Sequence, residues 1–106
     1  MKELTYPEFA QQRTAQNFRL IDVREQDEYD DVHVQGAEHF ALSRIRDGEL
    51  PEQDSRPIAL ICRSGGRSAM AAQMLEAKGF AETTNIAGGT LSAIEASPEH
   101  VERAKR

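Results

Sequence analysis

Residues 57–80, PIALICRSGGRSAMAAQMLEAKGF, contain the arrangement that decides the fold. The apolar run from Ile58 to Cys62 is continuous, which is typical of a strand covered on both faces and therefore of a parallel sheet. Behind it, alanines allow a helix to pack closely on a sheet, and Gly79 suits a left-handed helix end. The stretch predicts a buried strand, a glycine-rich loop and a helix that begins near Arg67 or Ser68.

The rest of the chain alternates between helix and strand signals. Thr5 and Glu8 have the spacing of a capping box with Pro7 in the first turn, which predicts a helix to about Asn17. Further along we expect a strand at residues 20–23, an acidic helical turn at 25–31, a turn and a short strand within 33–42, a short helix ending near Gly48, a strand at 83–87, a helix at 88–96 and a polar helical tail at 98–106.

This alternation predicts an α/β domain, with a small, mainly parallel β-sheet flanked by helices on both faces. The 106 residues are close to the commonest size of one domain, so we expect a single domain over residues 1–106. Met70, Met74 and Leu75 occur at helical spacing and are expected to face its core.

Composition excludes several classes of function. The net charge of −5 and the lack of a basic stripe argue against nucleic acid as the main partner. The N-terminal sequence has no apolar stretch long enough for a signal peptide or a membrane span. One cysteine cannot form an internal disulfide, and with scattered histidines it makes no metal-ligand cluster. A free thiol fits a reducing compartment, so we expect the protein in the cytoplasm.

The lone Cys62 stands where ligand sites occur in such sheets, at the carboxyl end of a strand. Gly65 and Gly66 can take positive φ, which lets the loop turn its N–H groups inward as an anion-binding nest. The helix N-terminus and the arginines add a positive field, which lowers the pKa of a nearby thiol and makes it a nucleophile. A lone cysteine is often only a small buried apolar residue. The coincidence of strand end, Gly-Gly loop and helix start favours the functional interpretation.

The length of the loop narrows the reaction. Cysteine phosphatases wrap three phosphoryl oxygens with a cysteine, five residues and an arginine, whereas Arg67 follows Cys62 after only four residues and Ser68 has the phosphatase position. A loop that is one residue short suits a smaller target, such as a single sulfur atom. A phosphatase or arsenate reductase is therefore the least favoured hypothesis.

Three segments together resemble a single-domain rhodanese, of the thiosulfate sulfurtransferase family. They are the cysteine loop and helix quoted above, LIDVREQDEYDDVHVQGAEHFAL at 20–42 and NIAGGTLSAI at 85–94, and they occur in family order. The loop followed by RSAMAA is the most specific of the three. The resemblance covers roughly residues 3 to 96.

The resemblance implies a sulfurtransferase that needs no cofactor. Cys62 would take the outer sulfur of thiosulfate or a similar small anionic donor, expel sulfite, and pass the sulfur to cyanide or to a thiol acceptor, either a small thiol or a thioredoxin-like protein. Arg63 and Arg67 would attract the dianionic donor. Relatives that act on mercaptopyruvate typically lack these two arginines. The N–H groups of the loop would stabilise the persulfide; the loop residues are Arg63, Ser64, Gly65, Gly66, Arg67 and Ser68.

Two departures from the family pattern concern the acceptor side. Ile94 stands near the position of the family's usual tryptophan, and VHVQGA at 32–37 lacks a Gly and a Pro of the usual turn. Neither change touches the cysteine loop.

Other charged residues have a structural interpretation beside a functional one. Asp22 and Arg24 end a strand at the same sheet edge as Cys62 and could orient the loop or donor, but we favour an ion pair that ties the strand end to its neighbours. His33 is expected to satisfy backbone groups in a turn, because an ionised thiolate needs no base. The acidic run at 24–31 is expected to be a solvated face.

A second hypothesis, from another class, is a persulfide carrier or binding module. Such a protein would accept sulfur from a cysteine desulfurase and hand it to a partner, with little free turnover.

Overall fold

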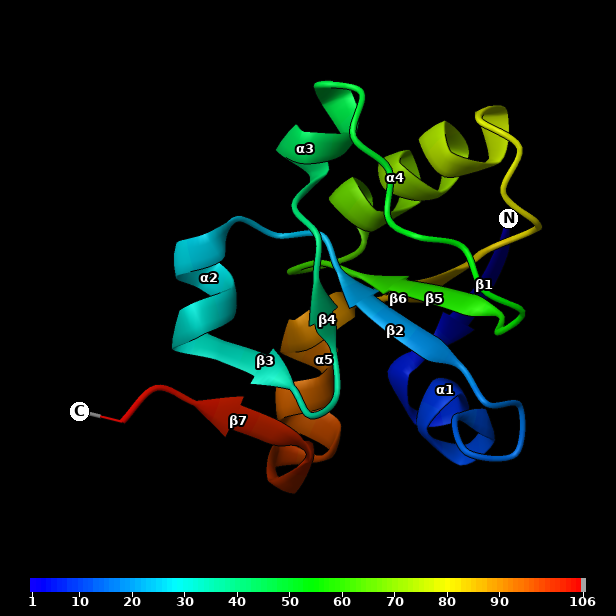
Figure 1. The fold of residues 1–106 in the computed structure, drawn as a ribbon. Helices are drawn as coiled ribbons and strands as arrows, with labels where there is room; N and C mark the ends of the chain where they lie inside the picture. The colour runs from blue at the N-terminus through cyan, green and yellow to red at the C-terminus, as the bar shows by residue number, and fades with distance from the viewer. Residues whose placement is uncertain (106) are drawn as a thin grey trace.

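The computed structural model describes residues 1–105, which form a five-stranded parallel sheet between two groups of helices (Figure 1). The strand order is β1 (Lys2–Thr5), β6 (Thr84–Ala87), β5 (Ile58–Ile61), β2 (Arg19–Asp22) and β4 (Glu38–His39). The helices are α1 (Tyr6–Gln12), α2 (Gln26–Asp31), α3 (Leu42–Arg46), α4 (Gly66–Ala77) and α5 (Gly89–Ala96). The predicted α/β class is confirmed. None of the helices within residues 1–105 combines the length and apolar character needed to cross a bilayer.

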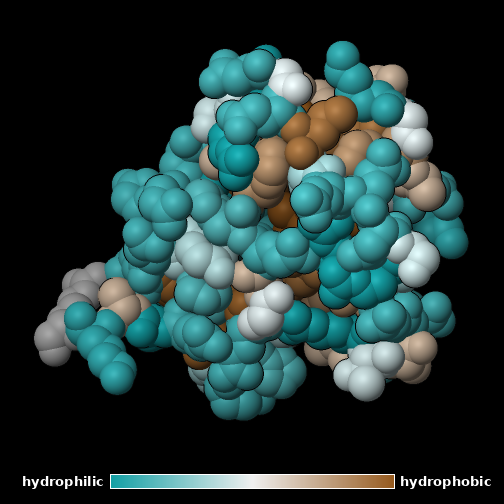
Figure 2. Space-filling model, viewed as in Figure 1, coloured by the Kyte–Doolittle hydropathy of each residue, from teal (hydrophilic) through white to brown (hydrophobic). Residues whose placement is uncertain are grey.

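The central strand β5 is buried on both faces, as its apolar run predicts. Leu60 belongs to the core under α3 and α4, whereas Ala59 and Ile61 belong to the core under α1 and α5. Figure 1 shows these two helix pairs on opposite sides of the sheet. Figure 2 shows hydrophilic residues over most of the viewed face, with hydrophobic ones mainly in the recesses between them. Cys62 therefore follows the carboxyl end of the central strand, between β6 and β2, with helices over both faces of the sheet.

The N-terminal segment differs from the prediction of one helix from Thr5 to Asn17. Residues 2–5 form the edge strand β1, and α1 ends at Gln12. No residue of β1 is buried, and its sequence KELT has no apolar pattern that would predict a strand. Its strand conformation depends on pairing with β6. The capping box is present: Thr5 Oγ1 accepts from the Glu8 N–H at 3.3 Å, and a Glu8 carboxylate oxygen accepts from the Thr5 N–H at 2.8 Å.

The C-terminal tail at 98–106 is not the helix that its polar sequence suggests. Residues 98–100 form one 3₁₀ turn (η1, Pro98–His100), and β7 (Val101–Arg103) then pairs antiparallel with β3 (Val32–Val34). The partly buried Val101 packs on the core that contains Val34. The prediction was wrong because the hydrogen-bonding partner of β7 lies about 70 residues earlier in the chain and leaves no local signal. Arg106 lies outside the described residues.

The buried face of α4 also differs in one residue. Met70 is 44% exposed, and the Arg46 guanidinium lies against its sulfur at 3.2 Å. Leu75 is fully buried and Met74 partly buried, as expected. The face toward the sheet is made mainly of small side chains, which let the helix approach closely; they are Ser68, Ala71 and Ala72 together with Leu75.

The start of α5 holds the backbone of the cysteine loop. The N–H of Thr90 donates to the Cys62 carbonyl at 2.8 Å, and the N–H of Leu91 donates to the Arg63 carbonyl at 3.1 Å. Gly89 permits this approach, since a Cβ atom there would lie 2.5 Å from the Cys62 oxygen, and its φ is +55°. The glycine pair before α5 therefore serves the position of Cys62.

We expect Gly89→Ala to lower the free energy of unfolding by more than about 2 kcal/mol, because the new methyl group collides with two backbone carbonyls. Urea titration followed by circular dichroism measures the loss. Gly48→Ala is the matched control: its φ is +93° but nothing lies within 4 Å of the new atom, so only the backbone strain of about 1 kcal/mol applies. Equal losses in the two variants would contradict the close-approach argument.

We expect Thr5→Ala to cost about 1 kcal/mol of unfolding free energy, because the N-terminal amides of α1 lose their side-chain acceptor. The same urea titration applies. Thr14→Ala, an exposed threonine just beyond α1, should change stability by less than about 0.5 kcal/mol. If the two substitutions cost the same, the capping box contributes nothing.

Candidate functional site

Cys62 follows β5 directly, and the chain reaches α4 within three further residues. Gly65 has a φ of +113°, the left-handed conformation that its sequence position predicts, and caps the helix. The prediction of a positive φ at Gly66 is wrong, because α4 begins at this residue rather than at Arg67 or Ser68, and a helical φ needs no glycine. The turn into the helix is therefore made by Gly65 alone.

The loop turns its N–H groups toward the sulfur. The N–H of Gly65 donates to Cys62 Sγ at 3.0 Å, and the N–H groups of Ser64 and Ser68 also act to lower the pKa of this thiol. The Ser68 hydroxyl adds a side-chain hydrogen bond at 3.3 Å. Cys62 is only 1% exposed, so these donors act on a buried sulfur.

Burial and hydrogen bonding act on the Cys62 thiol in opposite directions. Burial raises its pKa, whereas hydrogen bonds from the Ser68 hydroxyl and from the N–H groups of Ser68, Gly65 and Ser64 lower it. The result is a pKa below that of an ordinary cysteine. The loop thus favours the thiolate through donors placed on the sulfur itself.

The arginines of the loop lie differently from the sequence-based expectation. Arg67 forms two hydrogen bonds with the Glu28 carboxylate of α2, at 2.6 Å and 2.9 Å. The acidic run at 24–31 is predicted to be a solvated face, but Glu28 is paired with Arg67. The hydrogen bonds from Arg67 lower the pKa of Glu28 to about 2. Arg63 is exposed. One of the two cations predicted to receive the donor is thus already paired with a carboxylate.

Asp22 and Arg24 form a buried ion pair beside the end of β5. Their closest atoms lie 2.8 Å apart, the side chains are 0% and 4% exposed, and Asp22 pairs in register with Ile61. The Arg24 guanidinium also donates to the Val32 carbonyl at 2.5 Å. These contacts tie the end of β2 to β3, which is the interpretation favoured from the sequence.

The histidines have other partners than Cys62. His33 Nδ1 hydrogen-bonds the Tyr29 carbonyl at 2.8 Å, as expected of a residue that satisfies a turn. His39 bonds the Arg24 carbonyl at 2.6 Å, and His100 bonds the Tyr6 hydroxyl at 2.9 Å. Each ring therefore holds backbone or side-chain structure together.

Sequence reasoning missed the Ser68 hydroxyl and Asn85. Asn85 lies on β6, is 2% exposed, and accepts from the Ser68 hydroxyl at 2.5 Å. The available signal was a polar residue inside an otherwise apolar strand, since a buried amide must find partners. The identity of those partners is not encoded locally.

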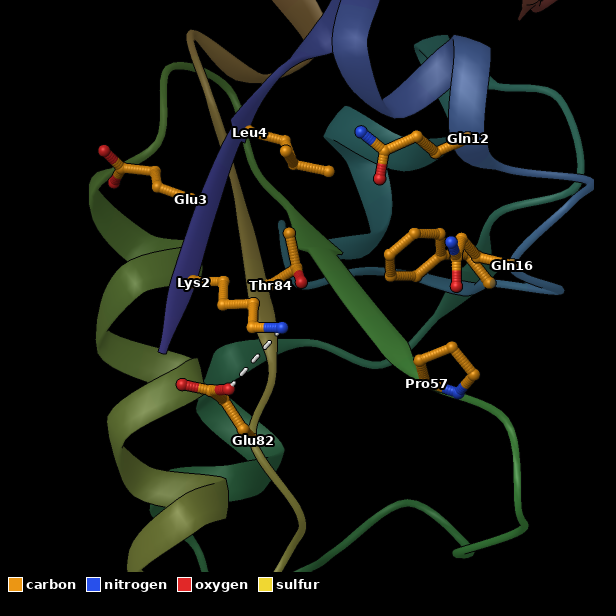
Figure 3. A pocket seen from close by; sticks show the side chains of 9 residues that line it. Lys2, Glu3, Leu4, Gln12, Gln16, Pro57, Glu82 and Thr84 are labelled. Atoms are coloured by element: carbon orange, nitrogen blue, oxygen red, sulfur yellow. Dashed lines mark ion pairs between the residues drawn. The ribbon is translucent and has the colours of Figure 1, made fainter.

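Two surface depressions frame the sheet. One, of about 320 Å³, lies beside the cysteine loop and is lined by Arg63, Leu91 and Ile94, so the residue at the family's tryptophan position faces this space. The other, of about 490 Å³, lies at the amino ends of the strands, near Pro57 and Thr84 (Figure 3). Figure 3 shows an ion pair and amide side chains there. Cys62 lies at the opposite edge of the sheet, after the carboxyl end of β5.

Known proteins are similar to this chain in sequence and in fold. A family model described as a rhodanese-like domain matches residues 5–95. A putative sulfur carrier protein of Bacillus subtilis, YrkF, is 38% identical over 76 residues, which are 70% of this chain and 40% of YrkF. The thiosulfate sulfurtransferase GlpE of Coxiella burnetii is 30% identical over 70 residues, which are 66% of this chain and 65% of GlpE. The chain thus spans less than two thirds of either relative.

The crystal structure of SSP1007 from Staphylococcus saprophyticus superposes with a TM-score of 0.78 at 30% identity, covering 97% of this chain and all of that one. The family match spans both helix layers, the cysteine loop and the glycine pair before α5. The expected resemblance is confirmed: this chain belongs to the rhodanese-like family.

Proposed function

We propose that this protein is a sulfurtransferase that carries a sulfane sulfur as a persulfide on Cys62. The observation that carries the proposal is the set of hydrogen bonds from the loop to the buried sulfur, which lowers the pKa of the thiol. A thiolate with a weak tendency to protonate is the nucleophile that sulfur transfer requires. A free thiol also fits a reducing compartment, and we place the protein in the cytoplasm.

The reaction has two displacement steps. The Cys62 thiolate attacks the outer sulfur of thiosulfate or a similar anionic donor; a new S–S bond forms, the donor's S–S bond breaks, and sulfite leaves with the electron pair. A thiol acceptor, as its thiolate, or cyanide then attacks the outer sulfur of the persulfide. Cys62 leaves as a thiolate and is ready for another cycle. The sulfur moves between nucleophiles in both steps, so the chemistry calls for no cofactor.

The loop residues divide this work. The N–H groups of Ser64, Gly65 and Ser68 meet the charge on the Cys62 sulfur. Arg63 is exposed and lines the depression of about 320 Å³, where its charge would attract an anionic donor. Arg67 would contribute its charge only if the donor displaced Glu28, or shared Arg67 with it.

A persulfide carrier is the second candidate function. The similarity to YrkF, which is named a putative sulfur carrier, favours it, and so does the pairing of Arg67 with Glu28, which weakens the attraction for a free dianion. A carrier would take sulfur from a cysteine desulfurase and show little turnover with thiosulfate. Efficient steady-state turnover with thiosulfate and a small thiol would exclude a purely carrier role.

The persulfide itself is the primary test. Incubation with thiosulfate should add one sulfur atom to the intact mass, cyanide should remove it, and Cys62→Ser should abolish it, because Cys62 is the only cysteine of the chain. Absence of the adduct in the wild-type protein, with thiosulfate and with a persulfide donor, would reject the proposal.

We expect Glu28→Gln to lower the KM for thiosulfate about two- to five-fold, because the freed Arg67 guanidinium then interacts with the dianion. Steady-state kinetics at low ionic strength measure the effect. Asp27→Asn is the matched control, since it removes the same charge from an exposed position of the same helix. An equal change in both variants would mean that Arg67 has no specific part in donor binding.

A further inference from the structure

The Ser68 hydroxyl faces more acceptors than it has protons. Its oxygen lies 2.5 Å from Asn85 Oδ1, 3.2 Å from the Gly65 carbonyl oxygen and 3.3 Å from Cys62 Sγ. A hydroxyl carries one proton, so it can donate to only one of them fully at a time. Ser68 is 0% exposed, so bulk solvent does not reach it. The sulfur therefore shares its side-chain donor with a neighbouring amide.

The orientation of that amide follows from its other contacts. Asn85 Nδ2 donates to a Glu3 carboxylate oxygen at 3.1 Å and to the Gly65 carbonyl at 3.3 Å. Both partners accept hydrogen bonds and cannot donate them. Turning the amide over would set its oxygen against two acceptors, so Oδ1 must face Ser68.

We propose that Asn85 is a positioning residue that competes with Cys62 for the single proton of the Ser68 hydroxyl, and that Glu3 holds Asn85 in the competing orientation. The competition follows from the contacts of Ser68 and Asn85 alone. Its consequence for sulfur transfer rests on the proposed function.

The consequence is that the Ser68 hydroxyl changes its acceptor when Cys62 changes from thiolate to persulfide. A thiolate is a strong acceptor and draws the Ser68 proton to itself. When Cys62 carries a second sulfur, its inner sulfur is no longer charged and becomes a weak acceptor, and the hydroxyl rotates to Asn85 Oδ1. The proton stays on Ser68 throughout. The fully buried hydroxyl thus has an acceptor in both states, Cys62 in the first and Asn85 in the second, and Asn85 reduces the preference for the bare thiolate over the persulfide.

The charged groups around Cys62 are the same in either arrangement of the Ser68 proton. Arg67 of α4 lies within electrostatic reach of the sulfur, and Asp22 and Glu28 act in turn on Arg67. Arg24 pairs with Asp22, and Glu3 adjoins Asn85 from β1. Substitutions at Ser68 and Asn85 leave all these charges in place.

The test is the pH profile of alkylation of Cys62 by iodoacetamide, which reports the thiolate directly because the chain has one cysteine. Asn85→Ala removes the nearest competing acceptor and leaves only the Gly65 carbonyl beside Cys62, and we expect the midpoint of the profile to fall by up to about one pH unit. Ser68→Ala removes the donor and should raise the midpoint by about one pH unit. In the Ser68→Ala background, Asn85→Ala should have no further effect.

Thr83→Ala is the matched control. It removes another buried side-chain hydrogen bond, to Glu76, just before the same strand, and should leave the midpoint unchanged. Circular dichroism confirms that each variant is folded. If Asn85→Ala does not fold, Glu3→Gln, at an exposed position, is used in its place. A glutamine amide can donate as well as accept, so residue 3 no longer dictates the orientation of Asn85. Glu3→Gln should therefore lower the midpoint more in the wild-type than in the Ser68→Ala background.

A rise of the midpoint in Asn85→Ala, or an equal shift with and without the Ser68 hydroxyl, would overturn the proposal. Either result would mean that Asn85 only supports the loop. Alkylation requires no sulfur donor, so the outcome is independent of whether thiosulfate forms the persulfide.

Discussion

The thiol of Cys62 is buried under the sheet's covering helices, and burial alone would keep it protonated. Hydrogen bonds from three backbone N–H groups and one hydroxyl oppose this effect and bring the pKa of the thiol below that of an ordinary cysteine. These donors require a chain that leaves β5, turns sharply at Gly65 and begins a helix at once. Most of the local backbone conformation, from the strand end to the first turn of α4, is therefore coupled to the charge on one sulfur atom.

The neighbouring strands support this arrangement because β5 is central in the sheet. On one side β6 contributes Asn85, and the glycine pair that follows it brings the N–H groups of α5 to the carbonyls of Cys62 and Arg63. On the other side β2 ends in Asp22, which neutralises the buried Arg24. Parallel strands end at the same edge of a sheet, so the end of β2 brings Asp22 beside the cysteine loop, whereas Asn85 reaches the loop with its side chain from within β6.

Charge at the site is balanced rather than strongly positive. Arg24 and Arg67 each have a carboxylate partner, and the thiolate is stabilised by hydrogen bonds at the sulfur rather than by an unpaired guanidinium. Under the proposed function, such a site would accept sulfur donors of more than one kind, from a small dianion to a persulfide carried by another protein. The rhodanese-like relatives include proteins named for both roles.

The sequence by itself determined the parts of this protein that depend on neighbouring residues. The apolar strand, the lone Cys62, the left-handed Gly65 and the alanine-rich helix are consecutive, so composition and spacing reveal them, and with them the α/β class. The capping box at Thr5 and Glu8 is equally local. Only the tertiary structure decided that residues 2–5 and 101–103 form strands, since their partners are distant. It also decided that Glu28 neutralises Arg67 from 39 positions away, and that Asn85 reaches Glu3 across 82 positions. A hydrogen bond between distant segments depends on how the sheet is ordered, and no local pattern of residues records that order.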